Sequence, residues 1–589
     1  MNYNLNKHIK KVERKRGFWE SLRKLTDIIA TEKYKLAFAF IAILLNVVLS
    51  LLGPYLLGYT IDTHVQTKNY KGVLIFAGIL LAIYICAYLL NYVQIRMMGN
   101  IGQRLLFRLR NNVFKKLQEL PLDFFNQNKA GDLISRINND TDNLSDFFSH
   151  SLMQFISNLV MMIGAGGFLL SLNLPLGLAT LSPTLILLIF TITISPWIRR
   201  KNKATLKSLG NLSAEIQEGL ASFKVIVAFD RRDYFRKRLD KVNNNNYKIS
   251  IHAGIANSLL SPIYTFASNF GQLIVLTLGI WLISQGQFSI GLLISFIAYV
   301  SNFYNPLRQL ARFWSNFQLT LAAWDRISQL LALESNLPIS KEGSKEHSSS
   351  SVVHFKNVSF TYPNNKEEVL KNVSFELKKG KTYAFVGPTG GGKTTTASLI
   401  SRLYDVTKGT VLLHGKDIKS YTAFERAEKI GFILQDPILF TDTLRNNILY
   451  GNTEYKSITD KELKRILDNA QLSDLLQSFE QGLDTPITMG GDSISLGQKQ
   501  IIAFIRAILR KPDLLILDEA TANIDTVTEK QLEVILSNLP KSTTKVIIAH
   551  RLNTIKNADE IFFVNSQKII TAGSFDEAVE LIMQEQGVS

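Results

Sequence analysis

The chain contains a single cysteine, Cys86, among its 589 residues, and this excludes a disulfide framework. Cys86 lies inside a long apolar run, so we expect it to serve packing, although one thiol does not diagnose the redox compartment. The length is too great for one core and indicates several domains. A small disulfide-stapled scaffold is therefore excluded.

Charged side chains are nearly absent from the middle of six apolar runs, each long enough (about 20 residues) to cross a bilayer. Their polar residues are mainly amides, hydroxyls and aromatics, such as Asn158, Asn269 and Gln272. A carrier driven by protons or sodium usually needs carboxylates within the membrane, so this composition argues against secondary transport. The amides either bond neighbouring helices or line a substrate cavity. The runs lie near 36–59, 72–94, 152–172, 176–197, 259–283 and 290–312.

The sequence also lacks a nucleic-acid-binding signature, although a net charge of +17 could suggest one. Lysine and arginine instead gather at the N-terminus and in the second and fourth links between the runs, whereas the three short links carry few, chiefly Lys68. The basic N-terminus is no secretory signal, because charged residues follow it without a cleavage site. By the positive-inside bias, we expect a multi-pass protein of the plasma membrane with both termini cytoplasmic and no nucleic-acid partner.

The two long basic links are expected to be helical extensions of the spans. Leucine or valine recurs every four residues over 105–117, the pattern breaks at 121–125, and it resumes at 131–136. The fourth link repeats this plan, with 215–219 as its turn. Each tip is either simply solvated or docks on a soluble domain and transmits force.

Composition divides the chain into four parts. Residues 1–30 form a cytoplasmic segment with an interfacial helix, and 31–333 form a transmembrane domain with six spans and two long cytoplasmic loops. Residues 334–351 form a polar linker, and 352–589 read as an α/β soluble domain.

A glycine-rich turn follows the short apolar run 382–386 and precedes a helix, which is the layout that holds the phosphates of a nucleotide. Glycines let successive backbone N–H groups face the phosphates, and the helix points the positive end of its dipole at them. Lys393 can reach the β- and γ-phosphates, and the Thr394 hydroxyl can ligate Mg²⁺. The residues expected at the nucleotide are Gly387, Pro388, Thr389, Gly390, Gly391, Gly392, Lys393, Thr394 and Thr395.

Further polar residues follow apolar runs that read as strands. Asp518 and Glu519 end one such run, where Asp518 would hold Mg²⁺ and Glu519 would polarise the attacking water. Gln435 follows another run and could touch Mg²⁺ or the water, and His550 follows a third and could bond the γ-phosphate. Tyr362 could stack its ring on adenine.

A second anion site is predicted where the helix after 494–498 begins. Ser495, Gly497 and Gln498 would present a hydroxyl, a close backbone and a helix N-terminus to a phosphate. Two phosphate sites exceed the needs of one nucleotide. Two copies facing head to tail would use both, because each would close the other's ATP.

With these motifs in this order, the chain resembles an ABC transporter half-molecule of the exporter type over about residues 15–585. The resemblance implies a membrane all-α six-helix transmembrane domain followed by an α/β P-loop ATPase domain with a RecA-like core, an antiparallel β subdomain and a helical subdomain. It implies coupling helices near 124–132 and 215–219. The matched positions are Tyr362 (adenine-stacking aromatic), 387–394 (Walker A), Gln435 (Q-loop), Ser495, Gly497 and Gln498 (signature), Asp518 and Glu519 (Walker B), Asp525 (D-loop) and His550 (switch histidine).

Two motifs depart from the family pattern. The signature is usually LSGGQ, but Ile494 and Leu496 stand at its first and third positions, and the D-loop reads ANID rather than SALD. A bulky Leu496 would weaken the ATP site that this chain lends to its partner, whereas its own Glu519 is intact. This combination is similar to one subunit of a heterodimeric exporter, with a homodimer as the alternative.

We therefore expect an ATPase that exports apolar or amphipathic compounds, drug-like molecules or lipids, by alternating access in a dimer, with ATP and Mg²⁺ as its cofactors. Spans rich in Phe, Leu, Ile and Met, and poor in charge, suit such cargo. Peptide export, an ATP-gated channel and a regulatory module are the alternatives, and intact Glu519 and His550 favour a cycling pump.

Overall fold

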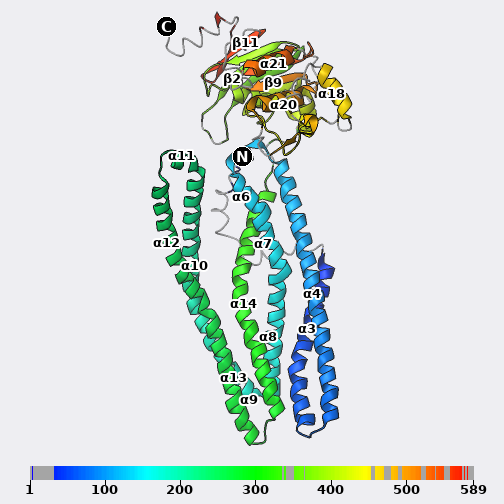
Figure 1. The fold of residues 1–589 in the computed structure, drawn as a ribbon, viewed down its shortest axis with the longest axis vertical. Helices are drawn as coiled ribbons and strands as arrows, with labels where there is room; N and C mark the ends of the chain where they lie inside the picture. The colour runs from blue at the N-terminus through cyan, green and yellow to red at the C-terminus, as the bar shows by residue number, and fades with distance from the viewer. Residues whose placement is uncertain are drawn as a thin grey trace. The chain divides into compact units, whose positions relative to one another are not determined.

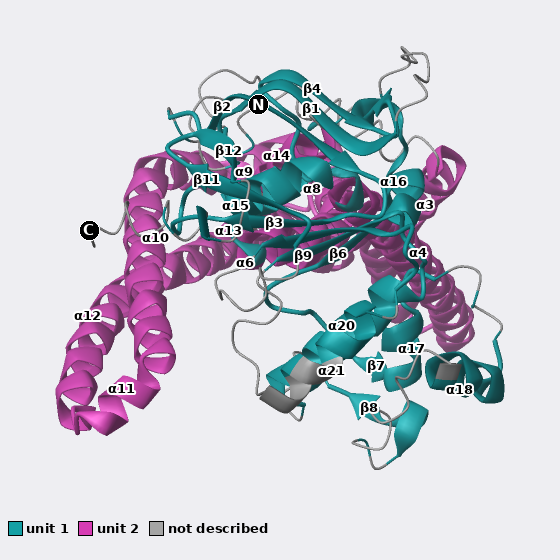
Figure 2. Cartoon of the chain, turned by 90° about the horizontal axis from the view of Figure 1, so that it is seen from above, with its two compact units in different colours: residues 1–5, 118–130, 333–589 teal, residues 6–117, 131–332 magenta. Residues whose placement is uncertain are grey.

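The structure is a computed structural model. It describes Tyr3, Leu5 and residues 32–334, then 350–572 with gaps at 364, 366, 453–454, 456–457, 470–478, 480, 489–493, 519–525, 538 and 549–557, and also 337, 339, 576–577 and 580. The chain forms two compact units, shown in different colours in Figure 2. One contains residues 6–117 and 131–332, and the other contains 1–5, 118–130 and 333–589.

The unit of residues 6–117 and 131–332 is helical (Figure 1). Its described elements are α3 (Lys33–Thr60), η2 (Ile61–Val65), α4 (Tyr70–Glu119), α6 (Ala130–Ser135), η3 (Arg136–Asp140), α7 (Thr141–Asp146), η4 (Phe147–Ser151), α8 (Leu152–Leu172), α9 (Leu174–Leu181), α10 (Pro183–Ala221), α11 (Phe223–Ala228), α12 (Arg232–Ser258), α13 (Leu260–Ser284) and α14 (Ile290–Leu331). In the described part of the chain, six helical segments are long and apolar enough to cross a membrane. The six predicted spans are thereby confirmed.

Polar side chains start two of these helices. Asn173 accepts a hydrogen bond from the N–H of Leu176 at the start of α9, and Ser289 accepts one from Leu292 at the start of α14. Each cap satisfies an N–H group that the helix itself leaves unpaired. These short capped connections turn the chain sharply between successive spans.

The core of the spans is organised around α14. Phe296, Tyr299 and Tyr304 are fully or almost fully buried there. The Tyr299 hydroxyl donates to the carbonyl of Leu51 on α3 at 2.6 Å, and the Tyr304 hydroxyl donates to Thr180 on α9 at 2.9 Å. A buried hydroxyl with a partner avoids a desolvation cost of about 1–3 kcal/mol. The last span is thus tied to two others.

Two local expectations were wrong. The range 215–219 continues α10 as helix, and the chain turns instead on either side of α11, at Ser222 and at Asp230, whose φ is +50°. Figure 1 shows α10 and α12 running side by side from this tip. Cys86 is exposed on α4, so within this chain it packs no core.

The other unit is built on strands. Its described strands are β1 (Ser351–Phe360), β2 (Leu370–Lys378), β3 (Thr382–Val386), β4 (Lys408–Leu413), β5 (Lys416–Asp417), β6 (Ile430–Ile433), β7 (Asp442–Thr443), β8 (Pro486–Ile487), β9 (Leu514–Asp518), β10 (Thr544–Ile548), β11 (Glu560–Asn565) and β12 (Lys568–Ala572). Its described helices are α5 (Leu122–Gln127), α15 (Lys393–Ile400), η5 (Ile418–Ser420), α16 (Ala423–Lys429), α17 (Leu444–Leu449), α18 (Asp460–Asn469), η6 (Gly482–Asp484), α20 (Leu496–Ile508) and α21 (Thr526–Ser537).

These strands form one large and two smaller sheets. The large sheet has the order β12-β11-β3-β10-β9-β6 and is parallel except for β12. A second, antiparallel sheet has the order β2-β1-β4-β5. The two-stranded sheet of β7 and β8 belongs to the part of the unit that contains α17, α18 and α20, whose buried side chains share one core. The expected α/β core with a β subdomain and a helical subdomain is confirmed.

Candidate functional site

Four parallel strands end at the same edge of the large sheet. Phe385 on β3 is paired with Ile548 on β10, which is paired with Asp518 on β9. Ile433, the last residue of β6, is paired with Leu517. Because the carboxyl ends of parallel strands meet at one edge, the segments that follow these strands begin beside one another.

The turn after β3 is a cradle that only glycine permits. Gly387, Gly390 and Gly392 have φ of +138°, +84° and +112°, a conformation that side chains rarely adopt. A Cβ on Gly387 or Gly391 would approach the carbonyl oxygen of Val564 to 2.2 or 2.5 Å. Backbone N–H groups can therefore line this turn closely, as the phosphates of ATP require.

Lys393 and Thr394 begin α15 directly after the cradle. Lys393 is 5% exposed, and its Nζ donates to the carbonyls of Gly387 at 2.7 Å and Pro388 at 2.9 Å. The ammonium therefore lies against the loop that would surround the phosphates. The Thr394 hydroxyl donates to Oδ1 of the buried Asp518 at 3.2 Å.

This hydroxyl and carboxylate pair fits Mg²⁺, which prefers oxygen ligands and usually combines one or two protein groups with phosphates and water. Among the described residues there is no group of three His, Cys, Asp or Glu side chains that could hold a metal ion. The pair of Thr394 and Asp518 is thus the part of the described site that suits the metal.

Tyr362 lies immediately behind the cradle. Its hydroxyl is 2.9 Å from Oγ1 of Thr395, and its ring makes edge contacts with Phe360 and Tyr404. Gln435 is exposed in the segment after β6. The structure therefore places Tyr362 beside the phosphate loop and Gln435 after the strand that neighbours β9.

The predicted signature residues begin α20. Ser495 Oγ accepts a hydrogen bond from the N–H of Gln498 at 3.2 Å, and Gln498 Oε1 accepts one from the N–H of Ser495 at 3.0 Å. This reciprocal capping box could have been recognised from the Ser-x-x-Gln spacing. Ile494 is 8% exposed and packs in the core of the helical subdomain, whereas Leu496 is 36% exposed. Of the two residues that differ from the family signature, Ile494 therefore serves packing, and only Leu496 presents its side chain outward.

Glu519, Asp525 and His550 lie outside the described residues. The strands that precede two of them, β9 and β10, end at Asp518 and Ile548, at the edge that carries the phosphate loop. Their assigned roles rest on the sequence.

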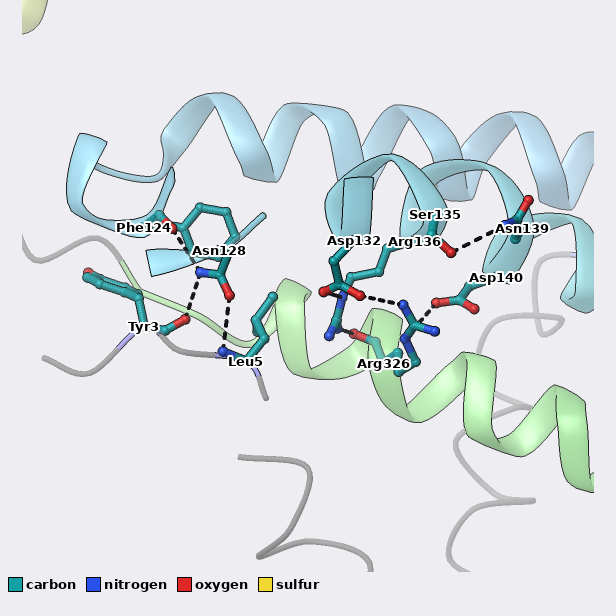
Figure 3. A network of polar contacts seen from close by, with 10 residues as sticks. All are labelled: Tyr3, Leu5, Phe124, Asn128, Asp132, Ser135, Arg136, Asn139, Asp140 and Arg326. Atoms are coloured by element: carbon teal, nitrogen blue, oxygen red, sulfur yellow. Dashed lines mark hydrogen bonds and ion pairs between the residues drawn. The ribbon is translucent and has the colours of Figure 1, made fainter. Parts of the chain in front are cut away.

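Sequence reasoning missed an anchor around α5 (Figure 3). Asn128 Nδ2 donates to the carbonyl of Tyr3 at 3.0 Å, and Asn128 Oδ1 accepts from the N–H of Leu5 at 3.2 Å. The Tyr3 side chain is fully buried, its ring meets Phe124 edge-on, and its hydroxyl donates to Glu334 at 2.8 Å. A lone tyrosine in a polar N-terminus carries no pattern that would have revealed this role.

The outer face of α5 contacts the strand-rich part of its own unit. Asn126 Nδ2 donates to the Tyr404 hydroxyl at 2.7 Å, and burial raises the pKa of Tyr404. Tyr404 in turn meets Tyr362, at 5.2 Å between ring centres. A chain of side chains therefore links α5 to the residue beside the phosphate loop.

In the helical unit, a buried ion cluster joins η3 and α6 to α14 (Figure 3). Arg136 is fully buried and contacts Asp132 at 3.1 Å, and its Nη1 donates to the carbonyl of Arg326 at 2.6 Å. Arg326 contacts Asp132 at 2.8 Å and Asp140 at 3.2 Å. Breaking such a buried group by removing one partner costs about 3–5 kcal/mol, so the cluster holds these helices together.

The spans enclose a cavity of about 470 Å³ with a polar lining. A second cavity of about 340 Å³ shares Gln154 and Asn158 with it. Both roles expected of the amides in the spans are found at Asn158, which lines the two cavities and donates a hydrogen bond to Gln309 Oε1 at 3.2 Å. The polar residues of the larger cavity are Ser151, Gln154, Asn158, Ser261, Arg308, Gln309 and Asn316.

Comparison with known proteins gives consistent similarities along the chain. Residues 36–307 match the family described as ABC transporter transmembrane region, and 370–522 match the family described as ABC transporter. An uncharacterised ABC transporter ATP-binding protein of Bacillus subtilis is 33% identical over 95% of this chain and 92% of its own. A fatty acid ABC transporter ATP-binding/permease protein of Mycobacterium bovis is 32% identical over 84% of this chain and 78% of its own. An ATP-dependent lipid A-core flippase of Haemophilus influenzae is 31% identical over 95% of each.

Proposed function

This chain belongs to the ABC transporters, as an exporter half-molecule that couples ATP hydrolysis to transport, and we propose that it exports amphipathic compounds from the cytoplasmic side of the plasma membrane. Its cargo, its partner and its orientation are parts of this proposal. The single observation that carries the ATP-driven mechanism is the hydrogen bond between Thr394 and Asp518, which brings the phosphate loop and the acidic strand end together.

ATP would lie in the glycine cradle, with Lys393 at the β- and γ-phosphates and Tyr362 at adenine. Mg²⁺, held by Thr394 and Asp518 with Gln435 nearby, would neutralise phosphate charge. Glu519 would orient and polarise the attacking water, and His550 would bond the γ-phosphate. Lys393 and Thr394 follow β3, Asp518 ends β9 and Gln435 follows β6. These strands end at one sheet edge, which is why residues distant in the sequence can act on one nucleotide.

The half-molecule works as a dimer, in which a second cassette would close over the nucleotide. The start of α20, with Ser495 and Gly497, would approach the partner's ATP and add a helix dipole to its γ-phosphate. The exposed Leu496 would hold the backbone away from that phosphate. We therefore favour a heterodimer, with one strong and one weak ATP site, over a homodimer.

Closure of the cassettes would reorient the spans through the helical tips. The bond between Asn126 and Tyr404 supports α5 as one point of coupling. The second tip, α11, carries the exposed apolar side chains of Phe223, Val225 and Phe229, which suit docking on a cassette. ATP can drive this change only by binding the closed state more tightly than the open one.

The cavity within the spans supports an amphipathic rather than a wholly apolar cargo. Its polar side chains would accompany a head group, and its apolar lining residues Phe155, Leu310 and Phe313 an apolar tail. Two of the relatives are named as a fatty acid transporter and a lipid A-core flippase, which favours lipids among the amphipathic candidates. Peptide export has no such support among the relatives described above.

The test is ATP hydrolysis and uptake of fluorescent lipid into inside-out proteoliposomes, with the chain alone and with a co-purified partner. ATP-dependent uptake that Lys393→Ala abolishes is expected, because this change weakens nucleotide binding. Passive ion current without uptake would instead identify a channel. Vigorous cargo-stimulated hydrolysis by the chain alone would contradict the heterodimer and leave the homodimer.

A further inference from the structure

We propose that Arg308 makes the larger cavity of the spans an anion-recognising site, so that the exported amphiphile carries a phosphate or carboxylate head group. This inference rests on the proposed function, because it names the chemical class of the cargo. It narrows that class to anionic amphiphiles and excludes lipophilic cations of the same size.

Arg308 is a cation in a cavity whose described lining residues offer it no counter-ion. It is half-buried on α14, and none of the described residues that line the cavity is acidic. No hydrogen bond or ion pair to another described residue is formed by its side chain. An ionisable side chain within a membrane span is costly, so it generally marks a pathway or a binding site. A guanidinium keeps its charge and matches phosphate and carboxylate in a two-point contact.

The described polar residues that line the cavity with Arg308 are neutral and can donate hydrogen bonds to an anion. Gln154, Asn316 and Ser261 line the cavity with it, and Asn158 is bonded to Gln309, the residue next to Arg308. An amide donates through its nitrogen without adding a competing negative charge. The set therefore resembles the surroundings of a bound oxyanion more closely than those of a cation.

An aromatic wall completes the site. The rings of Phe155 and Phe313, which both line the cavity, are stacked with 4.2 Å between their centres. The Phe313 ring also lies beside the rings of Phe147 and Phe317, with 5.7 and 5.9 Å between the ring centres. A polar side and an aromatic side in one cavity fit a molecule with a head and an apolar tail.

The position of Arg308 along α14 agrees with this assignment. It lies in the last part of the sixth apolar run predicted from the sequence, 290–312. A head group at Arg308 would therefore stay at the depth of the lipid head groups, while the tail enters the cavity from the hydrocarbon. The positive-inside orientation makes this the cytoplasmic leaflet.

The experiment compares two amphiphiles that share a chain and differ in the sign of the head. Full-length protein in nanodiscs of zwitterionic lipid is titrated calorimetrically, without ATP, with dodecyl phosphate, dodecyltrimethylammonium or inorganic phosphate, and empty nanodiscs are subtracted. Dodecyl phosphate should bind at least about tenfold more tightly than either other probe. Arg308→Gln should weaken its binding about tenfold or more, and Arg308→Glu should reverse the preference between the two amphiphiles.

Lys237→Gln is the matched control, because it removes one positive charge from the exposed part of α12 and should leave binding unchanged. Arg308→Lys keeps the charge and should retain part of the affinity, which protects the test against a misfolded Arg308→Gln. Equal binding of both amphiphiles, or full affinity in Arg308→Gln, would overturn the inference. Inorganic phosphate that binds as tightly as dodecyl phosphate would also overturn it, because the site would then select the free ion.

Binding without ATP separates this inference from the proposed function. Charge-selective binding that depends on Arg308, in a protein that neither hydrolyses ATP nor moves lipid, would support the site and contradict the exporter. If ATP drives lipid uptake equally well in wild type and in Arg308→Gln, and equally for anionic and cationic head groups, the exporter is supported and the site is contradicted.

Discussion

Thr394 and Asp518 lie 124 positions apart in the sequence, yet the Thr394 hydroxyl donates a hydrogen bond of 3.2 Å to Asp518 Oδ1. The contact forms because β3 and β9 both pair with β10 in parallel, so that their carboxyl ends face the same space. A hydroxyl and a carboxylate at this distance can share one small cation that also touches phosphate oxygens. The pair therefore defines where hydrolysis would take place.

Replacing Thr394 by valine should lower the apparent affinity for Mg²⁺ and reduce ATP hydrolysis at least about tenfold, because the metal loses an oxygen ligand while the volume of the side chain is kept. Hydrolysis measured across a Mg²⁺ titration checks this. Thr571→Val on the exposed face of β12 is the matched control. An unchanged Mg²⁺ dependence in Thr394→Val would remove the residue from the metal site.

Replacing Glu519 by glutamine should preserve ATP binding and reduce turnover by about a hundredfold or more, because an amide cannot polarise the attacking water. Binding of a fluorescent ATP analogue and phosphate release should be measured on the same sample. In a heterodimer the partner's site must be disabled as well. Normal turnover under those conditions would show that another group performs this step.

Replacing Leu496 by glycine should increase ATP hydrolysis in the dimer several-fold, because a smaller residue lets the backbone at the start of α20 approach the phosphate. Leu496 is partly exposed, so its removal costs little packing. The control is Ile494→Leu, a conservative change at the buried neighbour. A decrease in hydrolysis by Leu496→Gly would mean that this leucine supports the interface.

Replacing Tyr3 by phenylalanine should weaken the anchor on α5 by about 1 kcal/mol, since the hydroxyl bonded to Glu334 is lost. Tyr3→Ala should cost about 3 kcal/mol, because the ring packed against Phe124 is lost as well. Hydrogen exchange of the backbone amides in 122–128 should accelerate in that order. Tyr70→Phe, at an exposed tyrosine, should not alter it.

The stability of the strand-rich unit should fall as the pH drops through the range of His414. Burial lowers the pKa of His414 below its ordinary value, and this outweighs the opposing effect of Asp513, 3.1 Å away. The unfolded chain, with a histidine pKa of about 6.5, therefore takes up the proton before the folded one. The part of the free energy of unfolding that depends on neutral His414 is fully present above about pH 7.5. It is lost progressively from about pH 6.5 down to the lowered pKa of His414 in the folded protein.

His414→Gln should reduce the loss of stability that occurs below about pH 6.5. Thermal unfolding of the full-length protein in nanodiscs, followed from about pH 8 to pH 5, gives the difference between variant and wild type. His252→Gln, at an exposed histidine on α12, should keep the wild-type profile. A wild-type profile in His414→Gln would show that other groups carry the effect.

The fold could be predicted well wherever the signal is local. Six apolar runs are visible in the sequence because a span must satisfy its backbone internally and cover itself with apolar side chains. The tip at α11 was misplaced, because Gly219 does not break α10 and nothing near Ser222 signals a turn. Cys86 was misjudged because an apolar run in a membrane protein can face lipid as well as core.

The site could be predicted in part. Glycine spacing and strand-end acids predicted the phosphate loop and Asp518 as parts of one site, because those motifs combine local geometry with chemistry. The structure brings Thr394 and Asp518 within 3.2 Å, and their roles at the nucleotide stay predictions. The anchor of Tyr3 on Asn128 and the cluster of Arg136, Asp132 and Arg326 could not be found, since their members are brought together only by packing.

The sequence by itself determined the membrane spans, the ATP-binding cassette and the family, because hydropathy and backbone-dependent motifs act over short stretches of chain. Only the tertiary structure decided which distant side chains meet: Thr394 with Asp518, Asn126 with Tyr404, and Arg308 with the amides and rings of one cavity. The physical reason is that such contacts depend on how helices and strands pack, and packing is a property of the whole chain.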